Sequence, residues 1–528
     1  MKNIVNIINF VRGLEPREGR NIDLQKPIRE QIRVMRENGL RGTFLLQYDA
    51  LISKDFQALM EECRDFCEIG LWLEIVEPLV TRIGEEWKGR YPWDWYCDVG
   101  FLIGYAPEVR IRLVDEAMSK FKEVFGRYPD SVGSWHIDAV SMRHLSETYG
   151  VRACCICRDQ VGTDGYTMQG GYYNQAYYPS VNNMFCPAST EENQIDMPVF
   201  RMLGSDPIYA YDHQVFGYGF RHCPTLEPGQ LGRNAEWCDW FFGELFGGSG
   251  LCFQYTQAGQ ENSFGWEKMG EGIEYQFPRI AEMEREGKVQ VMTLGEAGAW
   301  YRDTYSVTPA ATIAAASAWE KPDCQSIWYY SRFYRINLLM DGGVLRVRDM
   351  YLFNEKYPSH YLTKRCDSHA CEFRNLPVMD GVIYSNPAKG ITAGVYLTRD
   401  GEPIRWDDMR YEETAPDQAV ITLTARCGEV KIILSESEVL LRTNAEKLRL
   451  CPVYDKERVF GTSRFGDETF ANHNNRKTNL TFITRARAEQ GTIGFTFDGF
   501  DYSLAVREGE IGEDLSLTPV SGMIRIQF

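Results

Sequence analysis

The sequence has no apolar run long enough to span a membrane, and its first residues hold no long apolar segment with a small-residue cleavage site. It also lacks a basic excess, since 57 Lys and Arg stand against 74 Asp and Glu and give a net charge of −17. Nucleic acids and anionic membranes bind clustered Lys and Arg, so we expect neither as a partner. These absences predict a soluble, cytoplasmic protein and leave open whether it forms a homo-oligomer.

Metal-binding spacings are scarce as well, and the whole chain has 7 histidines. Cys366, His369 and Cys371 form one cluster, but no second pair at zinc-finger spacing accompanies it, so we do not expect zinc there. Three of the 15 cysteines fall in one predicted core strand: Cys154, Cys155 and Cys157. Such cysteines are typical of buried free thiols in a reducing compartment rather than of disulfides.

A chain of 528 residues, 44% hydrophobic and 25% charged, exceeds what one core usually serves, so we expect two large domains. Residues 1–308 alternate strand-like and helix-like segments. The strand-like segments are residues 3–10, 42–47, 69–74, 131–136, 151–157, 199–203, 251–255 and 289–293, and the helix-like ones are residues 24–38, 54–66, 107–125, 141–149, 235–246 and 274–286. This alternation predicts an α/β fold, a (β/α)7–8 barrel that is closed or nearly so, as the catalytic domain.

After residue 308 the pattern changes to an alternation of apolar and polar residues with a period of two, broken by turn pairs. The turn pairs are Asp341-Gly342, Asp380-Gly381, Asp400-Gly401 and Asp498-Gly499. Asp-Gly pairs favour tight hairpins between antiparallel strands. Residues 309–528 are therefore predicted to form an antiparallel β-sandwich domain.

The stretch from Ser131 to Gly150 carries the most informative residues. A strand-like segment ends in Trp135, His136 and Asp138 before a helix-like one. Side chains two apart on a strand share a face, so His136 and Asp138 are predicted to point together beyond the carboxyl end of the strand. In parallel barrels the chemistry takes place at that end. Asp138 is therefore the first candidate for a catalytic residue.

A long loop between residues 158 and 198 has no clear regular element and is rich in tyrosine. Its acidic and aromatic residues include Asp164, Tyr172 and Tyr173. Similar aromatic residues lie near other predicted strand ends: Trp72, Trp135, Tyr209, Tyr211 and Trp266. Loops this long are usually functional or disordered, and the aromatic content argues against disorder. Aromatic faces beside carboxylates suit a sugar, while the alternative is that the tyrosines only pack on the barrel.

Three segments resemble motifs of glycoside hydrolase family 57. Residues 133–138, Gly-Ser-Trp-His-Ile-Asp, resemble its nucleophile motif, in which a carboxylate follows a Trp by three positions at the end of the fourth strand. Residues 70–75, Gly-Leu-Trp-Leu-Glu-Ile, resemble its substrate-contacting strand end, and residues 259–265, Gly-Gln-Glu-Asn-Ser-Phe-Gly, resemble the motif that supplies the general acid. The order of a degenerate barrel and a β domain is also similar to that family and to the wider glycoside hydrolase/deacetylase superfamily.

The resemblance implies a retaining glycoside hydrolase that uses two carboxyl groups about 5 Å apart and needs neither a cofactor nor a metal. Asp138 would be the nucleophile and Glu261 the proton donor. The His-rich first motif of the family is replaced here by residues 9–17, where Arg12 and Arg17 suggest an anionic or densely hydroxylated substrate. The residues expected to bind the carbohydrate are Arg12, Glu15, Glu74, Trp135, His136, Asp164, Tyr172, Tyr173, Arg201, Asp206 and Trp266.

Two other functions stay open on the sequence. Polysaccharide deacetylases and family 38 mannosidases of the same superfamily hold a divalent metal through His and Asp, and His136 with Asp138 would offer such a pair. The chain lacks the H-x-x-x-H and paired-Asp motifs of the deacetylases. The other alternative is a non-catalytic carbohydrate-binding protein built on the same barrel.

Overall fold

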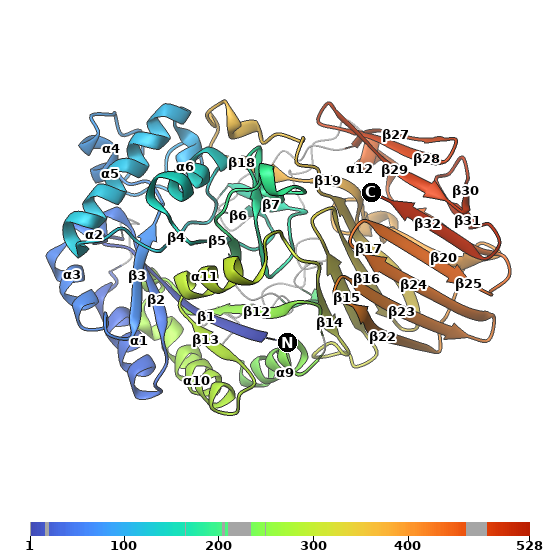
Figure 1. The fold of residues 1–528 in the computed structure, drawn as a ribbon, viewed down its shortest axis with the longest axis horizontal. Helices are drawn as coiled ribbons and strands as arrows, with labels where there is room; N and C mark the ends of the chain where they lie inside the picture. The colour runs from blue at the N-terminus through green and yellow to red at the C-terminus, as the bar shows by residue number, and fades with distance from the viewer. Residues whose placement is uncertain are drawn as a thin grey trace.

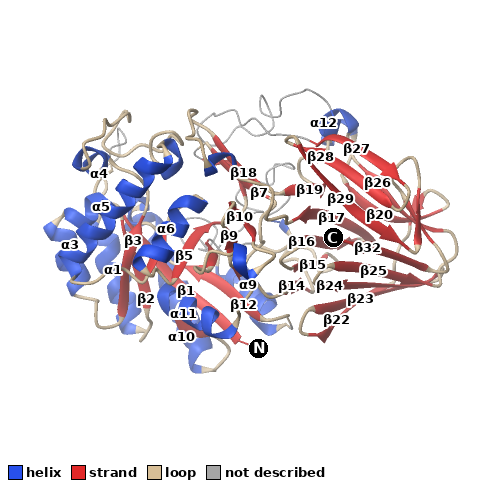
Figure 2. Cartoon of the chain, turned by 45° about the horizontal axis from the view of Figure 1, so that its top comes forward, coloured by secondary structure: helices blue, strands red, loops and turns tan. Residues whose placement is uncertain are grey.

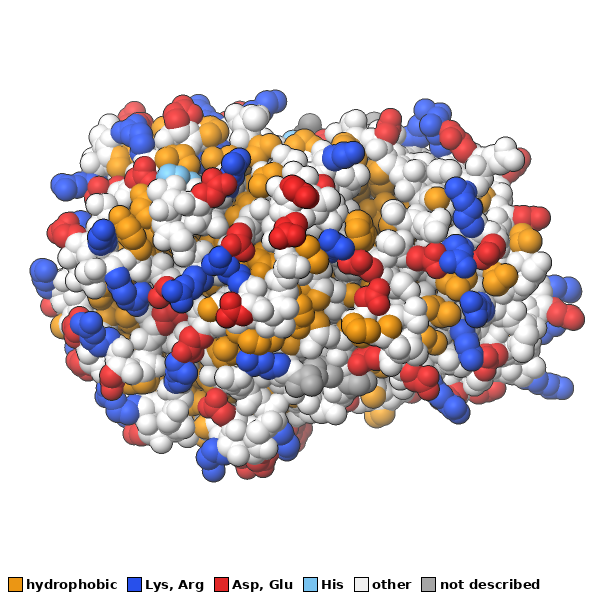
Figure 3. Space-filling view, viewed as in Figure 1, with side chains coloured by type: hydrophobic (Ala, Val, Ile, Leu, Met, Phe, Trp, Pro, Cys, Tyr) orange, Lys and Arg blue, Asp and Glu red, His pale blue; other side chains and the backbone are white. Residues whose placement is uncertain are grey.

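A computed structural model of the chain describes residues 2–15, 21–163, 165–202, 206–209, 234–248, 250–460 and 483–528. The part nearer the N-terminus contains a mixed sheet covered by helices, and the part nearer the C-terminus is almost entirely strands (Figures 1 and 2). Acidic and basic side chains are interspersed over the face seen in Figure 3. None of the helices in the described ranges is both long enough and apolar enough to cross a membrane.

The N-terminal sheet is a half-barrel of mostly parallel strands. In spatial order its strands are β12 (Phe253–Ala258), β1 (Lys2–Val11), β2 (Gly42–Leu46), β3 (Cys67–Trp72), β4 (Ser131–Gly133), β5 (Ala153–Cys157), β11 (Val199–Met202) and β8 (Ala176–Tyr177). Neighbours from β12 to β11 are parallel, β8 is antiparallel to β11, and β13 (Gln290–Met292) pairs with β1. The parallel strands predicted from the sequence are therefore confirmed.

Side chains rather than a strand ladder connect the two ends of the parallel run. The amide of Asn174 donates to the carbonyl of Tyr255 at 2.6 Å, and the amide of Gln175 donates to the carbonyl of Phe253 at 2.8 Å. Both acceptors lie on β12, whereas Asn174 and Gln175 immediately precede β8. In the described part of the chain, amide side chains therefore connect the segment before β8 to β12, and the strands form a half-barrel rather than a closed ring.

Helices cover this sheet and follow its strands. They are α1 (Gln25–Glu37), α2 (Tyr48–Ile52), α3 (Lys54–Glu61), α4 (Glu77–Arg82), α5 (Pro107–Phe125), α6 (Ala139–Tyr149), α9 (Ala235–Gly247), α10 (Trp266–Arg285) and α11 (Leu294–Thr304). Helix α1 buries Ile28, Ile32 and Met35, whose spacing of three and four residues forms one apolar face. Gly126, with a φ of 75°, ends α5 because glycine adopts the left-handed conformation without strain.

The segment after β5 forms several short strands, one of which pairs with a strand of the C-terminal part. They are β6 (Gln160–Thr163), β7 (Tyr166–Gln169), β9 (Pro179–Ser180) and β10 (Asn183–Pro187). Strand β18 (Cys371–Arg374) pairs with β7 in parallel over four residues. The two parts of the chain are therefore joined by backbone hydrogen bonds as well as by side chains.

The C-terminal part contains two antiparallel sheets. One has β14 (Ala311–Ala315), β15 (Gln325–Tyr330), β16 (Tyr334–Asp341), β17 (Val344–Leu352), β20 (Gly394–Arg399), β26 (Leu448–Val453), β31 (Leu517–Pro519) and β30 (Gly509–Ile511), with β19 (Leu376–Asp380) on β17 and β21 (Glu402–Pro403) on β20. The other has β22 (Asp408–Ala415), β23 (Gln418–Ala425), β24 (Gly428–Ser435), β25 (Glu438–Thr443), β32 (Met523–Gln527), β29 (Phe500–Arg507), β28 (Thr492–Phe497) and β27 (Ile483–Glu489). A short helix, α12 (Lys456–Phe460), follows β26.

Side chains of both sheets line one apolar cavity, with Ile336 and Val347 from one sheet and Ile432 and Ile524 from the other. The sheets therefore face each other across an apolar layer, as the alternation of residue types predicts. The expected division at residue 308 falls between α11 and β14, and it stays a prediction as a domain boundary.

Two of the Asp-Gly pairs form the tight turns expected of them. Asp400 and Gly401 have φ of 52° and 89°, and Asp498 and Gly499 have φ of 51° and 74°. Both residues of each pair are left-handed, as a type I′ hairpin requires. Asp380 differs, because it ends β19 and its carboxylate accepts the backbone N–H groups of the next turn.

Candidate active site

Four polar side chains meet where neighbouring parallel strands end. Arg12 directly follows β1, Gln47 directly follows β2, Glu74 comes two residues after β3, and Glu261 comes three residues after β12. The carboxyl ends of parallel strands share one edge, which is where α/β barrels and open sheets place their ligands. We call the group of Arg12, Glu74 and Glu261 the Arg12 centre.

Arg12 holds two carboxylates with a single nitrogen. Its Nη2 lies 3.1 Å from Oε2 of Glu74 and 3.1 Å from Oε2 of Glu261, so these two oxygens are no farther apart than twice that distance. The three side chains are 2–7% exposed. The guanidinium also lies 3.8 Å from the centroid of the Trp93 ring, which adds a cation–π contact. Two acids and one base thus share a desolvated space.

Glu74 is surrounded by hydrogen-bond donors. The indole N–H groups of Trp72 and Trp135 donate to its two oxygens at 2.8 Å each, and the amide of Gln47 donates at 3.2 Å. Burial raises the pKa of Glu74, and the charge of Glu261 adds to the rise, whereas Arg12 and the two indoles lower it. In the observed arrangement each of these groups donates to Glu74, which favours its ionised form.

Glu261 is held less completely. Its Oε1 accepts the hydroxyl of Ser263, and its backbone N–H donates to Oε1 of Gln260 at 2.8 Å. The next residue, Asn262, exchanges two hydrogen bonds of 2.9 Å with the backbone of Arg12. This exchange connects the segment after β12 to the segment after β1 and places the Glu261 carboxylate on the guanidinium.

Several buried polar atoms around the Arg12 centre have no hydrogen-bond partner within the described ranges. They are Nε and Nη1 of Arg12, Oε1 of Gln47, Nε2 of Gln260 and Nδ2 of Asn9. Such atoms are rare in folded proteins and usually bind water or a ligand. Donors and an acceptor that all lack a partner would suit the hydroxyl groups of a polar ligand.

Asp138 is placed differently from the sequence prediction. Strand β4 ends at Gly133, so His136 and Asp138 do not lie on a strand, and the argument that they share a face was wrong. Asp138 is instead the N-cap of α6, where its oxygens accept the backbone N–H and the hydroxyl of Ser141 at 3.1 and 2.7 Å. It also pairs with the fully buried Arg110 at 3.0 Å.

Arg110 shows that this pair has a structural function. Its other N–H groups donate to the carbonyls of Tyr105, Tyr361 and Lys364. A carboxylate that caps a helix and neutralises a fully buried arginine has a structural role that accounts for its position. The geometry therefore gives no support to Asp138 as a nucleophile.

His136 packs among aromatic rings, whereas Trp135 beside it binds Glu74. Its ring packs 4.3 Å from Phe101 and 5.1 Å from Phe373. Burial lowers the pKa of His136 to about 3, so the ring is neutral. Contact with a sugar, as predicted, would require an open face that these aromatic rings cover.

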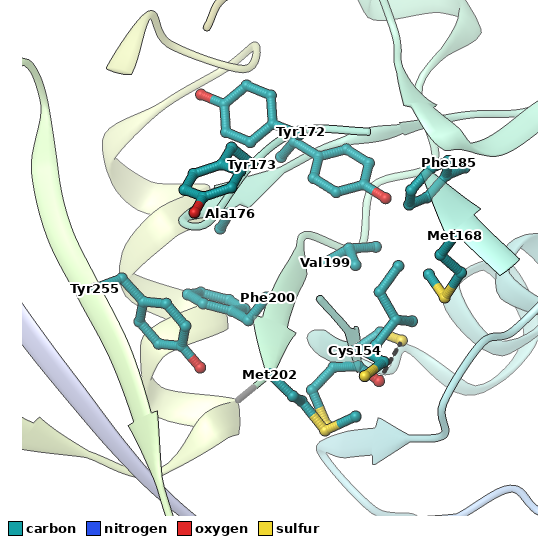
Figure 4. Packing of buried hydrophobic residues seen from close by; sticks show 14 of the residues in the cluster. Cys154, Met168, Tyr172, Tyr173, Ala176, Phe185, Val199, Phe200, Met202 and Tyr255 are labelled. Carbon is teal, nitrogen blue, oxygen red and sulfur yellow. Dashed lines mark hydrogen bonds between the residues drawn. The ribbon is translucent and has the colours of Figure 1, made fainter. Parts of the chain in front are cut away.

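The two tyrosines of the long loop belong to the core. The Tyr172 hydroxyl donates to the carbonyl of Pro309 at 2.8 Å, and Tyr173 stacks on Trp328 with ring centroids 3.7 Å apart. Figure 4 shows both tyrosines in one apolar cluster with Phe200. Their prediction as substrate contacts is corrected: they pack in the core, as the alternative stated, but against the C-terminal sheet as well as the barrel.

Arg201 and Asp206 are also structural. Arg201 is 1% exposed and binds Asp159 at 2.8 Å and the carbonyls of Cys157 and Tyr172. The carboxylate of Asp206 accepts two backbone N–H groups in the turn that follows it, and burial raises its pKa to about 6. Neither residue belongs to the Arg12 centre.

Three further predicted residues complete the comparison. Glu15 is half-buried and interacts electrostatically with Arg12. Trp266 begins α10 and lines a surface hollow with Ala235 and Tyr275. Asp164 lies outside the described residues.

The structure thus brings together Arg12, Glu15, Glu74, Trp135 and Glu261 from the predicted set. The sequence argument missed Gln47, Trp93 and Ser263. Gln47 was predicted as the last residue of a strand, so its position at a strand end was a usable signal. Trp93 lies in a tryptophan-rich loop. Ser263 carried no signal of its own.

Comparison with known proteins identifies the fold. No family model and no curated protein sequence matches the chain. A Parabacteroides distasonis protein assigned provisionally as a glycoside hydrolase/deacetylase superposes with a TM-score of 0.50 at 15% identity, covering 71% of this chain and 90% of that one. The chain shares the fold of that protein. Membership of glycoside hydrolase family 57 stays a prediction.

Two further structures resemble the chain less closely. A Mycobacterium smegmatis protein, assigned provisionally as a polysaccharide deacetylase, gives a TM-score of 0.35 at 12% identity over 57% of this chain and 91% of its own. An allantoinase gives a TM-score of 0.34 at 10% identity over 58% of this chain and 92% of its own. The chemistry of this chain must therefore be argued from its own side chains.

Asp49 supports the segment that follows Arg12 and gives the site a pH-dependent stability. Its carboxylate accepts the N–H of Ala50 at 2.7 Å and those of Gly13 and Leu14, and burial raises its pKa to about 6. An unfolded Asp titrates at about 3.9, so the protonated group stabilises the fold below about pH 4, and this contribution is lost as the pH rises through 6.

Asp49→Asn removes this titration. The stability of the variant relative to the parent is expected to increase by up to about 3 kcal/mol between pH 4 and pH 7. Urea unfolding of both proteins at four pH values measures the difference. A difference that does not change with pH would show that Asp49 is not the titrating group.

Proposed function

We propose that the chain is a retaining glycoside hydrolase whose reaction takes place at the Arg12 centre. The observation that carries the proposal is the pair of buried carboxylates, Glu74 and Glu261, held by one guanidinium at the carboxyl ends of parallel strands. Two carboxyl groups about 5 Å apart are what a retaining mechanism uses. The pair replaces the combination of Asp138 and Glu261 that the sequence predicted.

Glu74 is assigned as the ionised nucleophile. The donors around it, the indoles of Trp72 and Trp135 among them, all stabilise the charged form, although burial opposes ionisation. Its carboxylate would attack the anomeric carbon and form a glycosyl ester as the bond to the leaving oxygen breaks. The same donors fix the direction of the attacking oxygen, which lowers the entropic cost of the step.

Glu261 is assigned as the acid and base. Its Oε1 contacts a hydroxyl, Ser263, which is able to accept a hydrogen bond as well as to donate one. A protonated Glu261 therefore has an acceptor nearby. It would protonate the leaving oxygen in the first step and take a proton from water in the second, when water cleaves the glycosyl ester.

Arg12 and the surrounding indoles would bind the sugar. Nε and Nη1 of Arg12 are donors without partners in the described part of the chain, and half-buried Trp135 presents an aromatic ring beside them. A sugar offers hydroxyl groups to such donors and a C–H face to the ring. The N–H groups of Arg12 that have no partner in the described ranges favour substrates with many hydroxyl groups.

The metal-dependent deacetylase stays the alternative at the level of fold. At the Arg12 centre the donor set does not fit a divalent metal, because the guanidinium already lies between the two carboxylates and its charge would repel a cation. His136, which a metal-dependent deacetylase mechanism would require, packs among aromatic rings and is not part of this centre. We therefore derive no step through a metal at this centre.

One experiment separates the three functions. The purified chain is incubated with aryl glycosides of neutral sugars and uronic acids and with acetylated sugars, and phenol and acetate release are measured in parallel. Phenol release with retained configuration is expected. Acetate release alone would favour the deacetylase, and sugar binding without either product would favour the carbohydrate-binding protein.

A further inference from the structure

Three donor side chains from distant parts of the sequence meet beneath the loops that flank the Arg12 centre. Cys97 lies in the loop after α4, His136 follows β4, and Cys371 is the first residue of β18. Their sulfur and nitrogen atoms all lie within 4.8 Å of one another, and all three side chains are buried. Among the described residues, these three form a group of His, Cys or acidic side chains close enough together to hold a metal ion.

We propose that Cys97, His136 and Cys371 bind one thiophilic divalent metal ion, of which Zn²⁺ is the best fit, as a structural centre. Two thiolates and an imidazole are the donors that zinc prefers. Zn–S bonds of about 2.3 Å and Zn–N bonds of about 2.0 Å place a sulfur and a nitrogen about 3.5 Å apart in a tetrahedral site. The distance from Nε2 of His136 to Sγ of Cys371 is 3.7 Å.

The packing supports binding by the ring of His136. The ring is fixed by Phe101 and Phe373, and its Nδ1 has no hydrogen-bond partner within the described ranges. Its Nε2 contacts Sγ of Cys371 at 3.7 Å, and a thiol is a weak hydrogen-bond partner for a buried imidazole. A bond from this nitrogen to a metal would compensate better for the desolvation of the ring.

Cys366 is the candidate for a fourth ligand. It is buried, lies five residues before Cys371 and interacts electrostatically with both Cys97 and Cys371. Its thiol contacts the carbonyls of Ser368 and Ala370 at 3.2 and 3.5 Å. Rotation of this side chain would complete a Cys₃His set, the closed set typical of structural zinc.

The expected role follows from what the ligands join. The N–H of Cys97 donates to the carbonyl of His369 at 3.3 Å, so the turn before β18 already lies on the loop after α4. The same loop contributes Trp93, which stacks on Arg12, and the residue before His136 is Trp135, which binds Glu74. A metal at this centre would hold both indoles of the proposed active site in place.

The test measures zinc in the intact protein. Elemental analysis after purification with zinc in the medium is expected to find about one zinc per chain. Cys97→Ser and Cys371→Ser should each lose most of it, while Cys186→Ser, a buried thiol of β10, should keep it. Unchanged zinc in the first two variants, or no zinc in the parent, would overturn the proposal.

A second measurement does not depend on the folding of the variants. Addition of Co²⁺ to the metal-free parent under reducing conditions should give a thiolate-to-cobalt charge-transfer band and the visible bands of a tetrahedral ion. Peptide mapping without reduction tests whether Cys97 and Cys371 form a disulfide instead. Such a disulfide in protein purified under argon would contradict the metal site. Absence of the cobalt bands would also contradict the proposal.

Discussion

Glu74→Gln and Glu261→Gln are each expected to lower kcat on an aryl glycoside by about a thousandfold or more, because each change removes one of the two carboxyl groups that the retaining reaction uses. Glutamine keeps the shape of the side chain. Both variants should therefore remain folded. The matched control is Asp138→Asn, which weakens the cap of α6 and the pair with Arg110. It should lower the Tm and leave kcat unchanged.

The two variants are distinguished by the leaving group. Glu261→Gln should lose much more activity on glycosides with poor leaving groups than on activated ones, because the proton donor matters most when the leaving oxygen is basic. Its pH profile should also lose the limb at high pH. Glu74→Gln should lose activity on all substrates alike. The assignment would be wrong if Asp138→Asn abolished activity while both glutamine variants kept a normal kcat.

Arg12→Met is expected to destabilise the protein by about 3–5 kcal/mol, because it leaves two carboxylates buried without their counter-charge. In the variant the pKa of Glu74 should rise further above its ordinary value, because burial then acts without the opposing charge of Arg12. The stability of the variant should therefore be closest to the parent at acidic pH and should fall as the pH rises. Urea unfolding at several pH values measures this loss.

Two further variants control this prediction. Arg33→Met removes an arginine of α1 that is 41% exposed and pairs with Glu30 and Glu37, and such surface pairs contribute about 0–1 kcal/mol. Arg12→Met combined with Glu261→Gln should be more stable than Arg12→Met alone, since one uncompensated charge is gone. A double variant less stable than the single one would contradict the proposed electrostatics.

The strand and helix pattern of the N-terminal part was predictable because its periodicity is strong. Helix α5 spans Pro107–Phe125, the range expected from the sequence, since proline begins it and glycine follows it. The end of β4 was not predictable. Residues 131–136 are apolar enough for a strand, but the ladder stops at Gly133, and tertiary contacts decide where a ladder stops.

The candidate site was predictable where it depended on position after a strand. Arg12 and Glu261 come after predicted strands and Glu74 is the last residue of one, so the fold brings them together. Asp138 failed because a residue that follows a strand is also a residue that begins a helix, and a carboxylate suits both places. The group of Cys97, His136 and Cys371 could not be derived, because its members come from three segments whose contact depends on β18.

Chemical rescue with azide tests the central claim most directly, namely that Glu74 is the nucleophile of a carboxylate pair at the Arg12 centre. With an activated aryl glycoside, Glu74→Ala should regain activity in azide and release a glycosyl azide of inverted configuration, while Asp138→Ala should form none. Formation of the inverted azide by Asp138→Ala and not by Glu74→Ala would contradict the account.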